Sequence, residues 1–259
     1  MIVADLHVHT TNSDGTLTLE TLVSAAARAD LAAVAVTDHD RLHPGLDGPV
    51  TTLGGITVIH GIELRVATDT QRIDLLGFGA ERTADLVDLV DHLQTDRVER
   101  ARAIVECVQD RLGVDLDVGF EPGVGRPHIA RAIADSEADL GYDDAFDQLI
   151  GDDCPCYVPR DVPSFEAGRA VLSEACGVVG LAHPFRYDDP DAALELAAVL
   201  DAVELHYPYS SEVDVEPAAR VVTEHGLLVT GGSDAHDETL GRTGLDGEAF
   251  GCLRRALNI

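Results

Sequence analysis

The stretch Asp5-Leu6-His7-Val8-His9, followed by Asp14, is the part of the sequence around which the rest of the chain is organised. The apolar residues in and before it predict a buried β-strand, and residues two apart on a strand point to the same face. His7 and His9 therefore converge where the strand ends, and a turn over residues 12–15 can bring the carboxylate of Asp14 back over them. Two imidazoles and a carboxylate form the first half of a metal site. The alternative for this segment alone is a pair of histidines that are buried in the core and hydrogen-bonded there.

Length and hydropathy predict a single soluble domain or a domain with an insertion. The chain has 259 residues, of which 45% are hydrophobic, and this is ample for a core. No apolar run is long enough for a transmembrane helix, and the N-terminus lacks a basic-then-apolar signal. We therefore expect a cytoplasmic protein that makes no membrane contact.

The charge balance is strongly acidic, with 47 Asp and Glu against 18 basic residues, all of them Arg. We expect no double-stranded DNA partner, because binding to phosphate backbones depends on Lys and Arg. The acids are scattered along the chain, which is typical of proteins from extreme halophiles. In molar salt the Debye length falls to about 3 Å, so the net charge does not exclude a small anionic substrate.

Five cysteines at irregular spacing predict free thiols. The segment Cys154-Pro155-Cys156 leaves open a metal or redox pair as the alternative.

Short apolar strands alternate with helical patterns in both the first and the last third of the chain. Alternation of this kind predicts a parallel sheet or barrel, in which the carboxyl ends of the strands carry the site. A helix capped by Thr18 follows the first strand, and a helix over 216–225 is closed by Gly226. The expected strands cover residues 2–8, 31–36, 56–59, 72–78, 178–182, 202–205 and 227–230.

The middle of the chain has a different pattern, with apolar residues at helical spacing and Gly113 as a helix stop. We expect further helices over 127–134, 143–150 and 165–176. The predicted organisation is a barrel made of residues 1–82 and 177–259, with a mainly helical insertion over 83–176 that covers the site.

Acids and imidazoles recur where the apolar runs end, as they would around a shared metal cluster. Mixed His and carboxylate ligands suit Zn²⁺, Mn²⁺ or Fe²⁺. We expect two to three such ions, with Glu63 as a carboxylate that bridges two of them. Metal ions that share a bound water lower the pKa of that water. They also hold the attacking and the leaving oxygen when a phosphate ester is hydrolysed. The candidate ligands are His7, His9, Asp14, His39, Glu63, His183, Asp234 and His236.

These residues resemble the motifs of the PHP (polymerase and histidinol phosphatase) superfamily. The matching segments are His7-Val8-His9 with Asp14, Thr37-Asp38-His39, Gly61-Ile62-Glu63, Ala182-His183-Pro184 and Ser233-Asp234-Ala235-His236. The resemblance implies a distorted (β/α)7 TIM-like barrel with a trinuclear metal centre and phosphoesterase activity. It implies that His7, His9, Glu63 and Asp234 hold one ion, Glu63 and His183 a second, and Asp14, His39 and His236 a third.

The chain departs from the family pattern at Ile73-Asp74-Leu75-Leu76-Gly77, where relatives usually carry a His at the second of these positions. We expect Asp74 to be a ligand that shifts metal preference toward Mn²⁺ or Fe²⁺, because a carboxylate is harder than an imidazole. The alternative is a surface Asp beside an under-coordinated second ion.

A segment of the insertion, Gly125-Arg126-Pro127-His128, begins a predicted helix. A helix N-terminus with Arg and His beside it suits a phosphate group. The segment resembles that of the 3′,5′-nucleoside bisphosphate phosphatases and 5′–3′ exoribonucleases of the family. That likeness implies that Arg126 and His128 bind substrate phosphate, with His128 as a proton donor. The alternative is a surface Arg and a capping His.

Two residues near the strand ends are weaker candidates for substrate binding. Arg186 can meet a substrate phosphate or form a surface salt bridge. His206 faces the site either directly or behind a ligand, and His60 is expected to pack in the core.

The sequence therefore predicts a metal-dependent phosphoesterase that uses a metal-activated hydroxide on nucleotides or on the 5′ ends of short RNA. The alternatives are a histidinol-phosphate phosphatase, and a metal-binding regulatory module without catalysis. The ion identities and the oligomeric state stay open.

Overall fold

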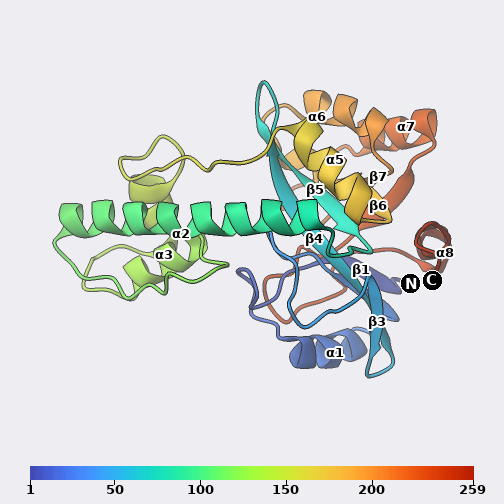
Figure 1. The fold of residues 1–259 in the computed structure, drawn as a ribbon, viewed down its shortest axis with the longest axis horizontal. Helices are drawn as coiled ribbons and strands as arrows, with labels where there is room; N and C mark the ends of the chain where they lie inside the picture. The colour runs from blue at the N-terminus through green and yellow to red at the C-terminus, as the bar shows by residue number, and fades with distance from the viewer. The chain divides into compact units, whose positions relative to one another are not determined.

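An eight-stranded sheet curls into a nearly closed barrel in the computed structural model, which describes residues 1–259 (Figure 1). Its strands run in the order β1-β2-β4-β5-β6-β7-β8, and β3 pairs with β4. Val8 at the end of β1 forms a bridge with Ala235 beyond β8, which brings the two ends of the sheet together. The strands are β1 Ala4–Val8, β2 Ala33–Val36, β3 Val50–Leu53, β4 Ile56–Ala67, β5 Arg72–Phe78, β6 Val178–Leu181, β7 Ala202–His206 and β8 Leu228–Gly231.

The sheet is mixed, which corrects the expectation of a parallel one. Strand β5 runs antiparallel to both β4 and β6, whereas β1–β2, β2–β4, β6–β7 and β7–β8 are parallel. The long strand β4 continues from Ile56 to Ala67 and folds back directly into β5 as a hairpin. Seven strands around the barrel, with β5 alone reversed, confirm the predicted distorted (β/α)7 barrel.

Helices cover the barrel strands and end where local signals predict. Thr18 caps α1 through its side chain, and Gly226 closes α7 in a left-handed conformation at φ 65°. Helix α8 was not predicted, because its apolar pattern is short, yet Phe250 and Leu253 pack into the barrel core. The helices of this unit are α1 Leu19–Arg28, α5 Phe165–Ala175, α6 Pro190–Leu196, α7 Glu216–His225 and α8 Gly247–Ala256, with 3₁₀ turns η2 Pro184–Arg186 and η3 Ala197–Val199.

The chain divides into two units, here called the barrel unit (Met1–Asp88 and Val162–Ile259) and the helical unit (Leu89–Asp161). The helical unit is narrower than the insertion expected over 83–176, because α5 belongs with the barrel strands. No helix in the chain is both long enough and apolar enough to cross a membrane.

The helical unit has its own apolar core and a disulfide bond. Ile104 and Val108 pack against Ile129 and Ile133, all of them fully buried. The elements are α2 Ala84–Leu112, which begins in the barrel unit, α3 Arg126–Ala134, α4 Tyr142–Ala145 and the π-helix η1 Phe146–Ile150.

The disulfide joins Cys107 to Cys156 and corrects the expectation of free thiols at these two positions. The two residues are 49 apart in sequence, and their Cα atoms lie 5.6 Å apart. Their spacing carries no pairing signal, because only the packing of α2 against the segment after η1 brings them together. Cys154, Cys176 and Cys252 are free, as expected.

Candidate metal centre

Three overlapping groups of nitrogen and oxygen donors lie in the barrel unit, beside the ends of β1, β2, β6 and β8. We name them by their carboxylates, and within each group the donor atoms lie within 4.8 Å of one another. The Asp14 group is His9, Asp14, His39 and His236; the Glu63 group is His7, His9 and Glu63; the Asp74 group is Glu63, Asp74 and His183.

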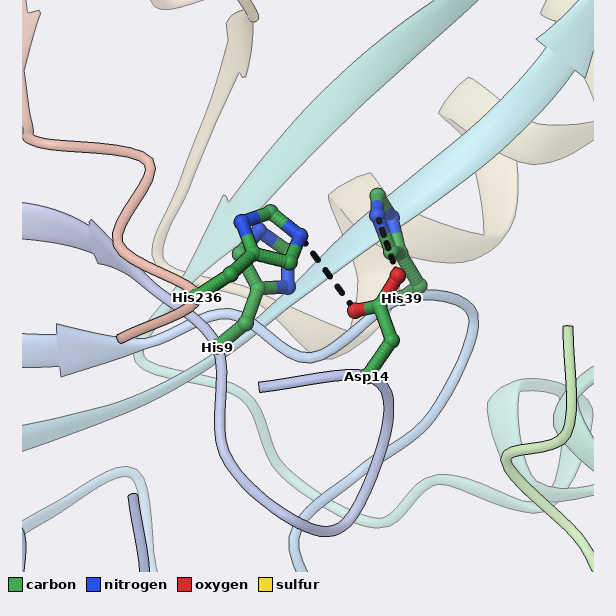
Figure 2. A group of neighbouring side chains, drawn as sticks. All are labelled: His9, Asp14, His39 and His236. Carbon is green, nitrogen blue, oxygen red and sulfur yellow. Dashed lines mark ion pairs between the residues drawn. The ribbon is translucent and has the colours of Figure 1, made fainter. Parts of the chain in front are cut away.

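The Asp14 group surrounds one carboxylate with imidazoles from three different segments (Figure 2). His236 Nε2 lies 3.3 Å from Asp14 Oδ1, and His39 Nε2 lies 3.8 Å from Asp14 Oδ2. The ring of His9 stacks on that of His236, with 4.3 Å between the ring centroids. The turn after β1 therefore carries Asp14 back over the strand end, as the sequence predicts.

A second buried carboxylate, Asp38, holds that turn in place. It accepts hydrogen bonds from the backbone N–H and the hydroxyl of Thr10, both at 2.7 Å, and from Ser13 Oγ at 2.7 Å. Asn12 Nδ2 donates to it as well, at 3.1 Å. Asp38 is thereby saturated with donors and acts as a support for Asp14.

The Glu63 group is completed by Asp234. Glu63 Oε1 lies 3.4 Å from His7 Nε2, and its Oε2 lies 3.4 Å from His9 Nε2. Asp234 Oδ1 lies 3.5 Å from His7 Nε2 and 3.1 Å from His9 Nε2. Glu63 stands inside β4, not at a strand end, because β4 continues past the site into the hairpin.

Glu204 in β7 orients this group and was not among the predicted site residues. Its Oε1 lies 3.0 Å from His7 Nδ1, and its Oε2 accepts a hydrogen bond from the backbone N–H of His183 at 2.8 Å. A carboxylate on the second nitrogen of an imidazole fixes the tautomer that presents the first nitrogen to a metal. The signal in the sequence was a single acid within an apolar strand.

Two of the site residues adopt left-handed backbone conformations. His183 has φ 24° and Asp234 has φ 47°, a region that non-glycine residues enter rarely. Packing is tight just before Asp234, since any side chain at Gly232 would collide with the backbone of His7.

Burial and neighbouring charges shift the pKa values of the carboxyl groups in opposite directions, and the charges outweigh burial. Burial raises the pKa of Glu63, but His39 and His7 lower it well below its usual range. Asp14 and Asp234 behave in the same way, and the net effect is a lowered pKa for both. All three carboxyl groups are therefore ionised at neutral pH.

Many donor atoms at the centre are buried without a hydrogen bond. Their chemical type shows whether the site fits a metal ion. Buried polar atoms are nearly always satisfied, so a cluster of orphaned ones indicates a missing ligand. The atoms are imidazole nitrogens and carboxylate oxygens, which are the ligands of divalent transition metals. They are His7 Nε2, His9 Nδ1 and Nε2, Asp14 Oδ1, Glu63 Oε2 and Asp234 Oδ1.

The Asp74 group differs, because its carboxylate already has a cation. Arg65 Nε and Nη2 donate to the two oxygens of Asp74, each at 2.6 Å. The structure brings Asp74 near His183, with 3.7 Å between Asp74 Oδ2 and His183 Nε2. Asp74 is buried, so the alternative of a surface Asp is wrong.

Of the two substrate candidates in the barrel unit, the structure brings only Arg186 to the donor groups. Arg186 Nη1 donates to Asp234 Oδ2 at 3.1 Å and to the hydroxyl of Tyr207 at 2.9 Å. Tyr207 also donates to Asp234 Oδ2, at 2.8 Å, and was not predicted. His206 is exposed at the end of β7 and is not one of the converging donors.

Arg126 and His128 lie in the helical unit, at the start of α3. Arg126 Nη1 donates to Asp152 Oδ1 at 2.9 Å, and the backbone N–H of Gly125 donates to His128 Nδ1 at 3.2 Å. Among the other histidines, His60 is buried and accepts from the backbone N–H of His43, in line with a packed core role.

The chain is similar to proteins of a known family. Residues 5–115 match the model of the PHP domain. The chain is also 30% identical over 255 residues to the phosphoribosyl 1,2-cyclic phosphate 1,2-diphosphodiesterase of Eggerthella lenta, covering 91% of this chain and 94% of that protein. The chain belongs to the PHP domain family.

Other PHP-like relatives match along most of their length. The chain is 28% identical to a 3′,5′-nucleoside bisphosphate phosphatase of Chromobacterium violaceum, covering 90% of this chain and 86% of that one. It is also 28% identical to the 5′–3′ exoribonuclease Rnm of Escherichia coli, covering 91% and 85%. A solved structure from Bifidobacterium adolescentis, described as a metal-dependent phosphoesterase, superposes with a TM-score of 0.81 at 25% identity, covering 98% and 96%. The barrel of this chain is thus the PHP fold.

Proposed function

We propose that the chain is a divalent-metal-dependent phosphoesterase that hydrolyses phosphate esters of nucleotides. The observation that carries this proposal is the cluster of buried, unpartnered imidazole and carboxylate atoms around Glu63. The nucleotide preference is supported by relatives that are a nucleoside bisphosphate phosphatase and an exoribonuclease. The candidate substrates are a 3′,5′-nucleoside bisphosphate and the 5′ end of a short RNA.

The donor set would hold Mn²⁺, Fe²⁺ or Zn²⁺. His7, His9, Glu63 and Asp234 would hold one ion, and Asp14, His39 and His236 would hold another. Bound there, divalent ions would lower the pKa of a water and neutralise charge on the phosphoryl oxygens.

The protein's own contribution at this centre is to keep the carboxyl groups ionised and the donors aimed inward. Glu204 fixes the ring of His7 through Nδ1 and leaves Nε2 facing Glu63. The histidines hold Glu63 and Asp234 in the ionised form that a cation requires. In a rigid, preorganised site of this kind, the charged groups do not have to reorganise during the reaction.

Arg186 is the proposed phosphate ligand of the barrel unit. Its side chain is 52% exposed, and it is held by the Tyr207 hydroxyl and Asp234 Oδ2. A guanidinium has five N–H donors in a fixed fork, so these two bonds from Nη1 leave donors for a phosphoryl oxygen.

In the helical unit we assign Arg126 to substrate phosphate and His128 to proton donation to the leaving oxygen. The support is their place at the first turn of α3, where backbone N–H groups and the helix dipole favour an anion. Arg126 also lies over the rings of Phe146 and Tyr157, at 5.8 and 5.7 Å from the ring centroids, which fixes its direction.

The acidic composition supports function in a salt-rich cytoplasm. With a formal net charge of −29, self-repulsion would be screened only at high ionic strength. We expect activity and the unfolding temperature to rise with KCl, and a protein that is equally stable in dilute buffer would contradict this assignment.

The deciding experiment is a substrate panel in high salt with added Mn²⁺. The panel contains 3′,5′-bisphosphoadenosine, a 5′-phosphorylated oligoribonucleotide, a ribose cyclic phosphate and histidinol phosphate. We expect phosphate or nucleotide release from one of the first two, abolished by EDTA and restored by Mn²⁺. Turnover of histidinol phosphate alone would change the substrate class, and no turnover with metals bound would indicate a regulatory module.

A further inference from the structure

Arg65 and Asp74 form a bidentate ion pair within the donor groups of the barrel, whereas Arg186 contacts Asp234 through a single nitrogen. The two residues face each other across the antiparallel β4–β5 hairpin, so their side chains project from opposed positions of the sheet. Both oxygens of Asp74 accept from the Arg65 fork, and Asp74 is buried. A bidentate pair of this kind is the strongest carboxylate contact that a side chain can make.

Asp74 itself lacks the feature that makes the carboxylates of the other two groups fit a metal. The Asp14 and Glu63 groups contain buried carboxylate oxygens without a hydrogen bond, whereas neither oxygen of Asp74 is among the unpartnered atoms. The unpartnered atom of His183 is Nδ1, while its Nε2 already lies 2.9 Å from Glu63 Oε1. Both oxygens of Asp74 and the Nε2 of His183 thus already have partners within the protein.

Electrostatics opposes a further cation at the same place. An ion bound between Asp74 Oδ2 and His183 Nε2, which are 3.7 Å apart, would share that carboxylate oxygen with the Arg65 guanidinium. Arg65 cannot relieve the repulsion by losing its proton. Two like charges that share one buried carboxylate repel strongly in a medium of low dielectric constant.

We propose that the Arg65 guanidinium occupies the charge position of a metal ion at the Asp74 group, so that the chain binds two divalent ions and not three. This inference rests on the proposed metal centre and departs from the expectation that Asp74 is a ligand. The fixed cation would keep Glu63 and His183 in place without an exchangeable ion.

The test is the metal content of the folded protein, measured by mass spectrometry after reconstitution with Mn²⁺ and removal of the excess. We expect about two Mn²⁺ per wild-type chain and about one more in Arg65→Met, which frees Asp74. The added ion should be lost again in Arg65→Met combined with Asp74→Asn. The matched control is Arg28→Met, which breaks an exposed pair with Glu238 and should leave the count unchanged.

A second variant covers the case in which Arg65→Met fails to fold. Asp74→Asn keeps a hydrogen-bond acceptor for Arg65, and we expect it to retain about two Mn²⁺ because Asp74 is not a ligand. Loss of an ion in Asp74→Asn, a wild-type count other than two, or an unchanged count in folded Arg65→Met would each overturn the inference. A wild-type chain that binds no divalent ion would overturn the proposed function as well, whereas a count of three would leave that function standing.

Discussion

The barrel unit concentrates buried polar atoms without hydrogen bonds in one cluster, which the helical unit does not. Around Glu63 in the barrel, several buried imidazole and carboxylate atoms lie close together without a hydrogen bond. In the helical unit, Arg126 is paired with Asp152, and Cys107 is joined to Cys156. Unsatisfied buried groups are costly and persist where a ligand compensates for them, whereas satisfied ones stabilise the fold. The difference places the candidate metal centre in the barrel unit.

The largest effect is expected at Glu63, which belongs to two of the three donor groups. Glu63→Gln keeps the size of the side chain but removes the charge that a cation needs. We expect loss of bound Mn²⁺ and a fall in kcat/KM of about 10³-fold or more, since metal-ion catalysis supplies several kcal/mol. Metal analysis and steady-state kinetics measure both. The control is Glu20→Gln on the exposed face of α1, and retained metal in Glu63→Gln would contradict the assigned centre.

The second-largest effect is expected on the stability of the helical unit alone. Cys107→Ser removes a cross-link between residues 49 apart, which should cost the helical unit about 4 kcal/mol by the chain-entropy relation. Hydrogen exchange followed by mass spectrometry should show faster exchange in α3 and unchanged exchange in β1. Cys252→Ser, at a free cysteine in the barrel unit, is the control. Equal protection of α3 in both variants would mean that the bond contributes nothing.

A satisfied histidine in the barrel provides the pH prediction. Burial, with help from the charges of Arg82 and His43, lowers the pKa of His60 to about 4. The unfolded chain binds this proton near pH 6.5, so unfolding takes up a proton between pH 6.5 and 4 and stability falls as the pH falls. The loss amounts to about 3 kcal/mol.

Urea unfolding of the wild type and His60→Gln at several pH values tests this sign. The slope of the unfolding free energy against pH should be smaller for His60→Gln between pH 6.5 and 4. His225→Gln, at the exposed end of α7, is the control. Parallel curves for all three proteins would show that His60 does not carry the acid sensitivity.

A fourth prediction concerns the helical unit. His128→Ala should lower nucleotide turnover about 10²-fold, the usual range for a lost proton donor, and leave the bound metals in place. The matched control in the same unit is His92→Ala, which breaks an exposed contact with Asp161. If metals leave His128→Ala instead, or if turnover is unchanged, the role proposed for His128 is wrong.

The smallest effect is expected at Glu204, which touches the centre only through His7 and the backbone of His183. Glu204→Gln should weaken Mn²⁺ affinity by about 10- to 100-fold, as is usual for a carboxylate behind a metal-binding imidazole. Titration calorimetry measures the affinity, with Glu195→Gln on α6 as the control. Metal affinity within twofold of wild type would mean that Glu204 serves the fold alone.

The sequence alone determined the features that depend on neighbours along the chain. Two histidines at alternate strand positions and a turn that returns Asp14 follow from local periodicity. The Thr18 cap and the Gly226 stop depend on hydrogen bonds within a few residues. For the same reason, most helices and strands are found close to their predicted ranges.

Only the tertiary structure decided the features that join distant segments. The reversed hairpin puts Glu63 and Asp74 inside strands, and it sets Arg65 opposite Asp74. The Cys107–Cys156 bond also links residues that the sequence does not relate. Local patterns state which residues can share a face, but strand direction and pairing depend on how the whole chain closes. For that reason, the candidate donors could be identified from the sequence, whereas the pairing of Arg65 with Asp74 could not.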